Sequence, residues 1–218
     1  MATKKDAEVV GIKALDMKTV RVKIVGITPL ITHAWSQKAK RMMLDAQMGK
    51  KAGKQREKKN PVDDFINSLY WLTEPPAEPT EDAFNEAIEA GARFGFPLTG
   101  IKQAGISAAY RAGWAKDKVS LRGAFYITGD TPDMVEIHGD PPIMREDMCR
   151  IGMGVADIRY RGEFRNWWME FDVTYNANGP YDLESILNII NLGGTACGLG
   201  EWRVERDGQF GMYRLATD

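Results

Sequence analysis

Alternating apolar and polar residues predict strands near both ends of the chain. The segment Val20-Arg-Val-Lys-Ile-Val-Gly26 changes character at nearly every position, which is typical of a strand with one buried face. A pair of strands near the C-terminal end is expected to form a hairpin around Asp207-Gly208, a strong turn dipeptide. That pair covers residues 203–206 and 209–215, and further strands are predicted near residues 124–128, 134–138, 157–161 and 167–175.

Helices are predicted between these strands, because capping residues are followed by apolar residues three or four positions apart. Thr99 suits the N-cap of a helix that is rich in small residues and reaches Arg111. A later helix, 183–192, is amphipathic, and Gly193 is expected to end it. The remaining predicted helices run from Ser36 to about Met48, over residues 61–71, and from Thr80 onward.

The predicted elements at the two ends of the chain follow the order strand, helix, strands, helix, glycine-rich loop and hairpin. This order indicates an α+β fold with a β-α-β-β-α-β core of the ferredoxin or RNA-recognition (RRM) type. We expect residues 1–17 to form a flexible arm and residues 18–218 a single domain, in which about 49–150 is a large, partly helical insertion. Within it, residues 49–60 carry almost no apolar side chain to bury and are expected to be mobile unless bound.

Composition narrows the class of protein. The 218 residues are 44% hydrophobic, enough for a core, and no apolar run approaches the roughly 20 residues of a membrane span. The first residues lack the apolar stretch of a secretory signal, so a cytoplasmic location is expected. Cys149 and Cys197 are too few for a disulfide framework or a four-cysteine zinc cluster. No cofactor-binding motif is present, so neither a metal nor a cofactor is expected.

Charge is unevenly distributed, although the net charge is only −1. Residues 38–59 contain nine Lys or Arg and two acids, whereas residues 74–89 contain six acids and no Lys or Arg. A molecule with two such poles can bind an anion on one face, or stack head to tail with other copies of itself. The alternative is that both runs are solvated surface.

The segment Gly193-Gly-Thr-Ala-Cys-Gly-Leu-Gly200 is the most informative motif. Its four glycines relax the steric limits on φ and allow backbone N–H groups to approach a phosphate. Trp202, Arg203 and Arg206 follow directly, and cations with an indole suit a nucleic-acid backbone and its bases. The alternative is a helix C-cap that leads into a hairpin.

Taken in order, three motifs resemble the RAMP superfamily, the repeat-associated proteins that form the backbone of CRISPR effector complexes. They are Val22-Lys-Ile-Val-Gly-Ile-Thr-Pro-Leu30, Phe96-Pro-Leu-Thr-Gly-Ile-Lys-Gln-Ala-Gly-Ile-Ser-Ala-Ala-Tyr-Arg111, and the glycine-rich loop 193–200. They are similar to the family's first strand, its proline-glycine entry into a helix, and its glycine-rich loop. The chain's ending also resembles that of bacteriophage proteins, so a bacterial or phage-infected cell is the expected setting.

The resemblance implies a non-catalytic subunit that lies along single-stranded nucleic acid, with RNA favoured over DNA. Copies would stack along the strand into a helical filament, with other effector-complex subunits as further partners. Aromatic side chains such as Trp35, Trp202 and Phe210 are candidates to stack on bases. The candidate nucleic-acid-binding residues are Lys38, Arg41, Lys50, Lys51, Lys54, Arg56, Lys58, Lys59, Lys102, Arg111, Arg159, Arg161, Gly198, Gly200, Trp202, Arg203 and Arg206.

Three alternatives stay open. His33 lies where RAMP-type endoribonucleases have a proton-transferring histidine, so metal-free RNA cleavage is a minority hypothesis, with a capping or core role as its alternative. A structural oligomer without nucleic acid, held by the two charged poles, is another hypothesis. The arginines 159, 161 and 165 are interpreted either as a cationic strand face or as members of salt bridges to Asp157 and Glu163.

Overall fold

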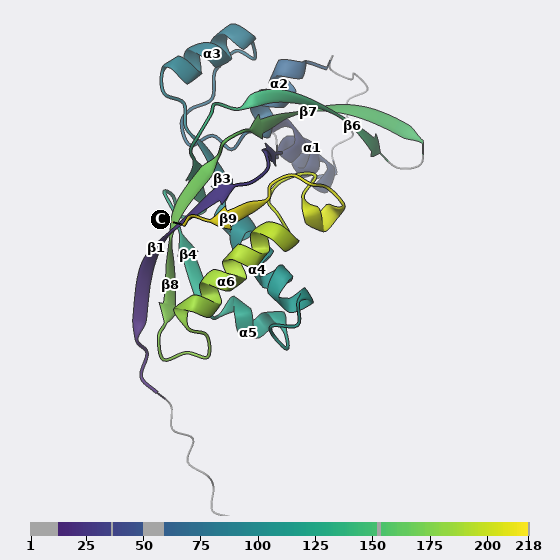
Figure 1. Ribbon diagram of the computed structural model, residues 1–218. Coiled ribbons are helices and arrows are strands. Elements are labelled where there is room, and N and C mark those ends of the chain that lie inside the picture. Colours follow the sequence, from purple (N-terminus) through teal and green to yellow (C-terminus); the bar gives the residue numbers. More distant parts are fainter. Residues whose placement is uncertain (1–12, 36, 50–58, 152–153, 218) are drawn as a thin grey trace, which may run out of the picture.

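The computed structural model describes residues 13–35, 37–49, 59–151 and 154–217 (Figure 1). It is an α+β structure with antiparallel sheets, which confirms the predicted class. Most of the predicted arm, and residues 50–58 of the segment predicted to be mobile, lie outside the described residues. Within the described ranges, no helix is long and apolar enough to cross a membrane.

A four-stranded sheet forms one layer of the molecule. It contains β1 (Met17–Gly26), β4 (Phe125–Thr128), β8 (Trp168–Asn176) and β9 (Tyr213–Leu215). The strands lie in the order β4-β8-β1-β9, and every neighbouring pair is antiparallel. The segments predicted as strands near 20–26, 124–128 and 167–175 are thus confirmed as β1, β4 and β8.

Side chains alternate across this sheet, so that one face is apolar and the other is charged. Ile24, Phe171 and Val173 are fully buried on the apolar face. The helices α4 (Leu98–Arg111) and α6 (Leu183–Ala196) cover that face and share its core (Figure 1). On the opposite face, Lys and Arg of β1 pair with Glu and Asp of β8.

Glycines let α4 and α6 approach closely. A Cβ at Gly193 would lie only 2.6 Å from the backbone nitrogen of Gly105, and a Cβ at Gly194 would overlap the carbonyl of Tyr213. Gly193 was expected to end the helix, but α6 continues to Ala196. The prediction is wrong because both glycines serve close packing inside the helix rather than a left-handed cap.

Two smaller sheets stand beside the main layer. The strands β2 (Leu30–Thr32), β7 (Val155–Phe164) and β6 (Ile143–Ile151) form one, in the order β2-β7-β6. β3 (Phe94–Pro97) and β5 (Met134–Ile137) form the other. The remaining elements are α1 (Gln37–Gln47), α2 (Pro61–Ser68), α3 (Glu81–Glu89), α5 (Lys118–Arg122) and a 3₁₀ turn at Val204–Arg206.

Hydrogen bonds fix the beginning of α2 and connect its other end to the β2-β7-β6 sheet. Asn60 accepts hydrogen bonds from the first-turn N–H groups of α2, which fixes where the helix begins. At its other end, the Ser68 hydroxyl accepts a hydrogen bond from the Gly162 N–H in β7. Ala34, which follows β2, donates its N–H to the carbonyl of Ser68. These contacts hold the chain after β2 against β7.

The prediction of a C-terminal hairpin is wrong. Residues 204–206 form the 3₁₀ turn, which ends at Asp207 in the left-handed conformation, with φ of 59°. β9 pairs with β1 instead of with residues 203–206. The physical reason is that Tyr213 is fully buried and its hydroxyl donates to the carbonyl of Ile190 in α6, which draws β9 to the edge of the main sheet.

Two further expectations are corrected. α4 begins at Leu98 with Pro97 as N-cap and no capping side chain, so Thr99 lies inside the first turn. The extent of the insertion, about 49–150, is wrong as well. That range contains α4 and β4, which pack against α6 and pair with β8 in the main layer.

Candidate functional site

A cleft of about 540 Å³ lies where residues 197–200, the part of the glycine-rich loop that follows α6, meet α4. We call it the loop cleft. The end of β2 contributes His33, and the chain after α2 contributes Tyr70. The full set of polar and glycine residues that line it is His33, Tyr70, Thr99, Gly100, Gln103, Ser107, Gly198, Gly200, Glu201, Arg203, Glu205 and Arg206.

The loop needs glycine at two positions. Gly198 and Gly200 have φ of 74° and 71°, a conformation that disfavours any side chain. A Cβ at Gly200 would also overlap the carbonyl of Ile31. Most of the loop's N–H groups bond within the protein: Leu199 donates to the carbonyl of Gly211, and Glu201 donates to that of Ile31. The loop therefore anchors β2 and the C-terminal segment, and the idea that it presents a row of bare N–H groups is wrong.

The first turn of α4 provides backbone donors instead. Pro97 caps this helix without a side-chain hydrogen bond, and Thr99 and Gly100 line the cleft. Leu98 donates its own N–H to the carbonyl of Asp133. The positive end of the helix dipole is thus directed toward the loop cleft, where it favours an anion.

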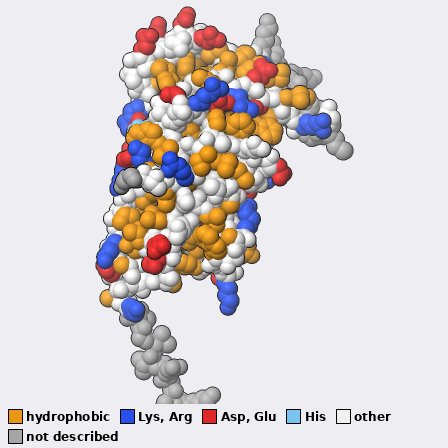
Figure 2. All heavy atoms as spheres, viewed as in Figure 1, with side chains coloured by type: hydrophobic (Ala, Val, Ile, Leu, Met, Phe, Trp, Pro, Cys, Tyr) orange, Lys and Arg blue, Asp and Glu red, His pale blue; other side chains and the backbone are white. Residues whose placement is uncertain are grey.

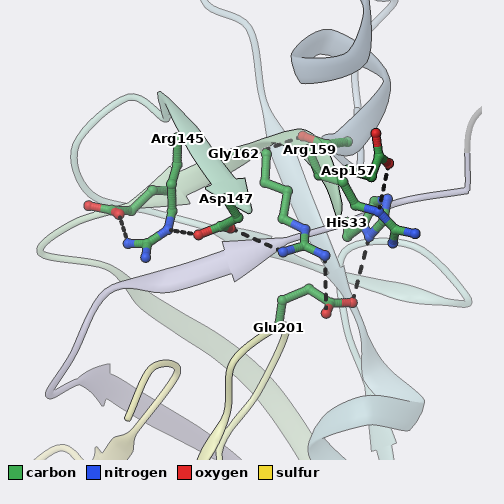
Figure 3. Close-up of polar contacts among 10 residues, drawn as sticks. His33, Arg145, Asp147, Asp157, Arg159, Gly162 and Glu201 are labelled. Carbon is green, nitrogen blue, oxygen red and sulfur yellow. Dashed lines mark hydrogen bonds and ion pairs between the residues drawn. The ribbon is translucent and has the colours of Figure 1, made fainter. Parts of the chain in front are cut away.

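Glu201 lies at the centre of the charges around the cleft (Figure 3). Its Oε1 is 3.7 Å from His33 Nδ1, and its Oε2 is 3.6 Å from the guanidinium of Arg161. The polar contact with His33, helped by the charge of Arg161, holds the pKa of Glu201 below its usual range. In the same cleft, burial and the Glu201 carboxylate raise the pKa of Tyr70, so its hydroxyl stays protonated.

Behind the cleft, ion pairs run along β6 and β7. Arg161 is almost fully buried and binds Asp147, which is also buried, with 3.0 Å between the charged atoms. Arg145 bridges Asp147 and Glu163 at 2.8 Å each. Figure 3 shows this line of charges leading from Arg145 through Asp147 to Glu201. Arg161 is therefore an internal partner of carboxylates and does not face solvent, contrary to its prediction as a nucleic-acid contact.

A second cluster at the cleft surrounds Glu205. Its carboxylate accepts hydrogen bonds from Arg111, Arg203 and the thiol of Cys197. Burial opposes ionisation here, but these hydrogen bonds hold the pKa of Glu205 below its usual range. Arg206 is exposed at the rim of the cleft and makes no ion pair with any residue that the structure describes. It is the cation of this cluster that remains available to a ligand.

The other predicted contacts fall in several places. Trp202 lies beside the loop and is exposed. Lys102 is on α4 but points away, since it donates to the carbonyl of Arg122. Lys59 and Arg159 both bind Asp157. Arg41 is exposed on α1, which also contains Lys38, while Lys50, Lys51, Lys54, Arg56 and Lys58 lie outside the described residues.

Of the two interpretations of arginines 159, 161 and 165, the structure supports salt bridges rather than a free cationic strand face. Arg159 pairs with Asp157, and Arg165 pairs with Glu163, as that alternative expects. Arg161 differs in its partners, which are Asp147 and Glu201. The sequence argument missed Tyr70 and the position of Glu201 beside His33, because no local pattern links three residues so far apart in the chain.

Among the residues that the structure describes, no group of three or more His, Cys, Asp or Glu is arranged to hold a metal ion. In comparisons with known proteins, no family model and no curated protein matches the chain.

Proposed function

We propose that the protein is a non-catalytic subunit that binds single-stranded nucleic acid, with RNA as the expected strand, and assembles with copies of itself along that strand. The observation that carries the proposal is the loop cleft. It brings the uncapped first turn of α4, the glycine-rich loop and the exposed guanidinium of Arg206 to one place. The helix end and the guanidinium favour a phosphate, and the loop shapes the space between them.

The order of the elements supports a relationship to the RAMP superfamily at the level of fold. The chain enters the main layer as β1, α4, β4, β8, α6 and β9, and the strands lie in the order β4-β8-β1-β9. This is the arrangement expected of a ferredoxin-like or RRM-like core. Residues 197–200 of the glycine-rich loop fall between the last helix and the last strand, the place that the family resemblance assigns to the loop.

Self-assembly is supported by the uneven charge of the surface. Acidic side chains gather at the end of the molecule formed by α3 (Figure 2), where Glu81, Asp82, Glu86 and Glu89 lie. The basic run 38–59 belongs to a different part of the chain, partly on α1. Opposite charges on two parts of one chain suit head-to-tail contacts between copies.

Binding is tested by fluorescence anisotropy of labelled single-stranded RNA and DNA, titrated at several salt concentrations. Affinity should fall as salt rises, because phosphate contacts release counterions. Arg206→Ala should lower the slope of log affinity against log salt by about 1, the amount expected for one lost phosphate contact. Arg122→Ala removes an exposed arginine outside the cleft and serves as the control. Salt-independent binding, or equal behaviour of the two variants, would contradict the proposal.

A second candidate function is metal-free cleavage of RNA, and the pair His33–Glu201 favours it. The two side chains are 3.7 Å apart at the loop cleft, and the protonated Tyr70 hydroxyl lines the same space. Glu201, which its lowered pKa keeps ionised, can take the proton from the 2′-hydroxyl as that oxygen attacks phosphorus. His33 can protonate the departing 5′-oxygen, which leaves a 2′,3′-cyclic phosphate.

This candidate is tested with end-labelled RNA in EDTA. His33→Ala should abolish cleavage and spare binding, and RNA with 2′-deoxy substitution should resist cleavage. Absence of cleavage by the unaltered protein would remove the enzymatic candidate and leave the binding proposal intact.

A further inference from the structure

A second cleft opens on the other side of His33. Its volume is about 410 Å³, and we call it the Trp35 cleft. Trp35 and Met43 line it from the chain after β2 and from α1, and Tyr160 lines it from β7. Asp63 and Asn67 of α2 complete its polar side. Since His33 lines both clefts, they are adjacent, and a single ligand that is long enough can occupy both.

The two aromatic side chains of the Trp35 cleft differ in how much they pack against the protein core. Trp35 is 64% exposed, an unusual position for an indole at the mouth of a cleft. Tyr160 is partly buried, packs against the core, and has the ammonium of Lys59 5.9 Å from its ring centre. An exposed indole facing a cleft gains contact area when a flat apolar ligand stacks on it.

The charges in the Trp35 cleft disfavour a phosphate. Its carboxylates are Asp63, Asp64 and Asp157, and its cations are Lys59 and Arg159. Both cations pair with Asp157, and Lys59 also lies 3.9 Å from Asp64. The hydrogen bond from Lys59 lowers the pKa of Asp157, so this carboxylate stays ionised. The cleft is thus acceptor-rich, whereas the loop cleft next to it offers donors and an unpaired guanidinium.

Asp63 is the carboxylate best placed to act as an acceptor for a ligand. It lies in the first turn of α2, and its Oδ1 accepts a 2.9 Å hydrogen bond from the Asn67 amide. That amide also donates to the Asp63 backbone carbonyl, so the side chain of Asn67 is held in place. An ionised carboxylate has about four lone-pair sites, so Asp63 retains capacity for two further donors.

We propose that the Trp35 cleft binds one unpaired base of the strand, stacked on Trp35, and that Asp63 selects guanine. Guanine presents two adjacent donors, N1–H and the 2-amino group, to a single carboxylate. Uracil has one ring N–H flanked by carbonyl oxygens, which Asp63 repels. The inference rests on the proposed function, because the loop cleft must hold the neighbouring phosphate.

The experiment compares three labelled ten-residue RNAs by fluorescence anisotropy: oligo-U, oligo-U with one central guanosine, and oligo-U with one central inosine. Inosine lacks the 2-amino donor. The unaltered protein should bind the guanosine RNA about 10-fold more tightly than oligo-U, with the inosine RNA between them, as expected for a hydrogen bond to a charged group. The intrinsic tryptophan fluorescence should fall when the guanosine RNA binds.

Two variants separate stacking from hydrogen bonding. Trp35→Ala should weaken binding of the guanosine RNA by about 10-fold and abolish most of the fluorescence change, since stacking on an aromatic ring contributes a factor of this size. Asp63→Asn should remove the preference for guanosine, because it weakens binding of the guanosine RNA and relieves the repulsion of uracil in oligo-U. Trp114→Ala and Glu184→Gln are matched controls, because Trp114 is a similarly exposed indole and Glu184 is likewise a first-turn helix acid.

The outcomes distinguish the two proposals. If none of the RNAs binds to the unaltered protein, the proposed function itself fails. If all three bind equally, and Trp35→Ala behaves like Trp114→Ala, the base-binding role of the Trp35 cleft is overturned while the loop cleft retains its role. Circular dichroism melting of each variant confirms that it folds, and Trp35 is exposed enough for its loss to leave the core unchanged.

Discussion

Replacing Arg161 by methionine tests whether the buried ion pairs hold the loop cleft in place. Arg161 is 3% exposed and its guanidinium lies 3.0 Å from Asp147 and 3.6 Å from Glu201. Methionine has a similar length but no charge, so Asp147 loses one of its two arginine partners inside the protein. Breaking a buried pair from one side typically costs 3–5 kcal/mol, because a charge is left without compensation.

The structure places Arg161→Met at the lower end of that range. Asp147 retains Arg145 at 2.8 Å, and Glu201 is 43% exposed and can be solvated. We therefore expect a loss of about 3 kcal/mol in the free energy of unfolding, measured by urea denaturation followed by tryptophan fluorescence. Arg161→Lys should recover only part of it, because an ammonium cannot fork between two carboxylates.

A double-mutant cycle gives the sharpest control. Asp147→Leu alone should also be strongly destabilising, since it leaves the guanidinium of Arg161 buried beside one distant carboxylate. The pair Arg161→Met with Asp147→Leu should cost less than the sum of the single changes, because no lone charge remains between them. A cost below 1 kcal/mol for Arg161→Met, or simple additivity in the cycle, would refute the reasoning.

Further predictions concern the helix ends, the helix contact and the pH dependence. Thr80→Ala should lower the free energy of unfolding by about 1 kcal/mol, because its hydroxyl caps α3, whereas Thr99→Ala should change it little. Gly194→Ala should lower the melting temperature by several degrees, because the added methyl group meets the Tyr213 carbonyl. Glu201 has a lowered pKa, so it stabilises the fold above its unfolded pKa, and this contribution is lost as pH falls through its folded pKa. The stability difference between the unaltered protein and Glu201→Gln should accordingly be largest near neutral pH and vanish in acid, as urea denaturation over a pH series would show.

The two clefts give the proposals a common geometry. The loop cleft provides donors and a free guanidinium, and the Trp35 cleft provides an exposed indole and carboxylate acceptors. His33 separates them. A flexible strand can be held when its phosphate binds in the cleft with donors and a cation and its base binds in the cleft with an indole and acceptors. On the proposed function, the same arrangement would let a chain with a net charge of −1 bind a polyanion.

The sequence by itself determined the elements whose signals are local. The alternation in β1 and β8 predicts strands with one buried face, and the burial of Phe171 and Val173 follows that pattern. Thr80 and Asn60 lie at the beginnings of helices because their side chains satisfy first-turn N–H groups. β6 escaped prediction because its buried face carries Arg145 and Asp147, which pair with Glu163 and Arg161 of β7, so it lacks the apolar alternation of a half-buried strand.

Only the tertiary structure decided the site. The loop cleft joins His33, Tyr70, Thr99 and Glu201, which are separated by dozens of residues and carry no shared spacing. Gly193 illustrates the physical reason: locally it is a helix breaker, but α6 continues through it because the contact with Gly105 requires a residue without a side chain. Likewise Arg161 resembles a surface cation in the sequence, and only the folding of β6, β7 and the glycine-rich loop around it makes it an internal charge.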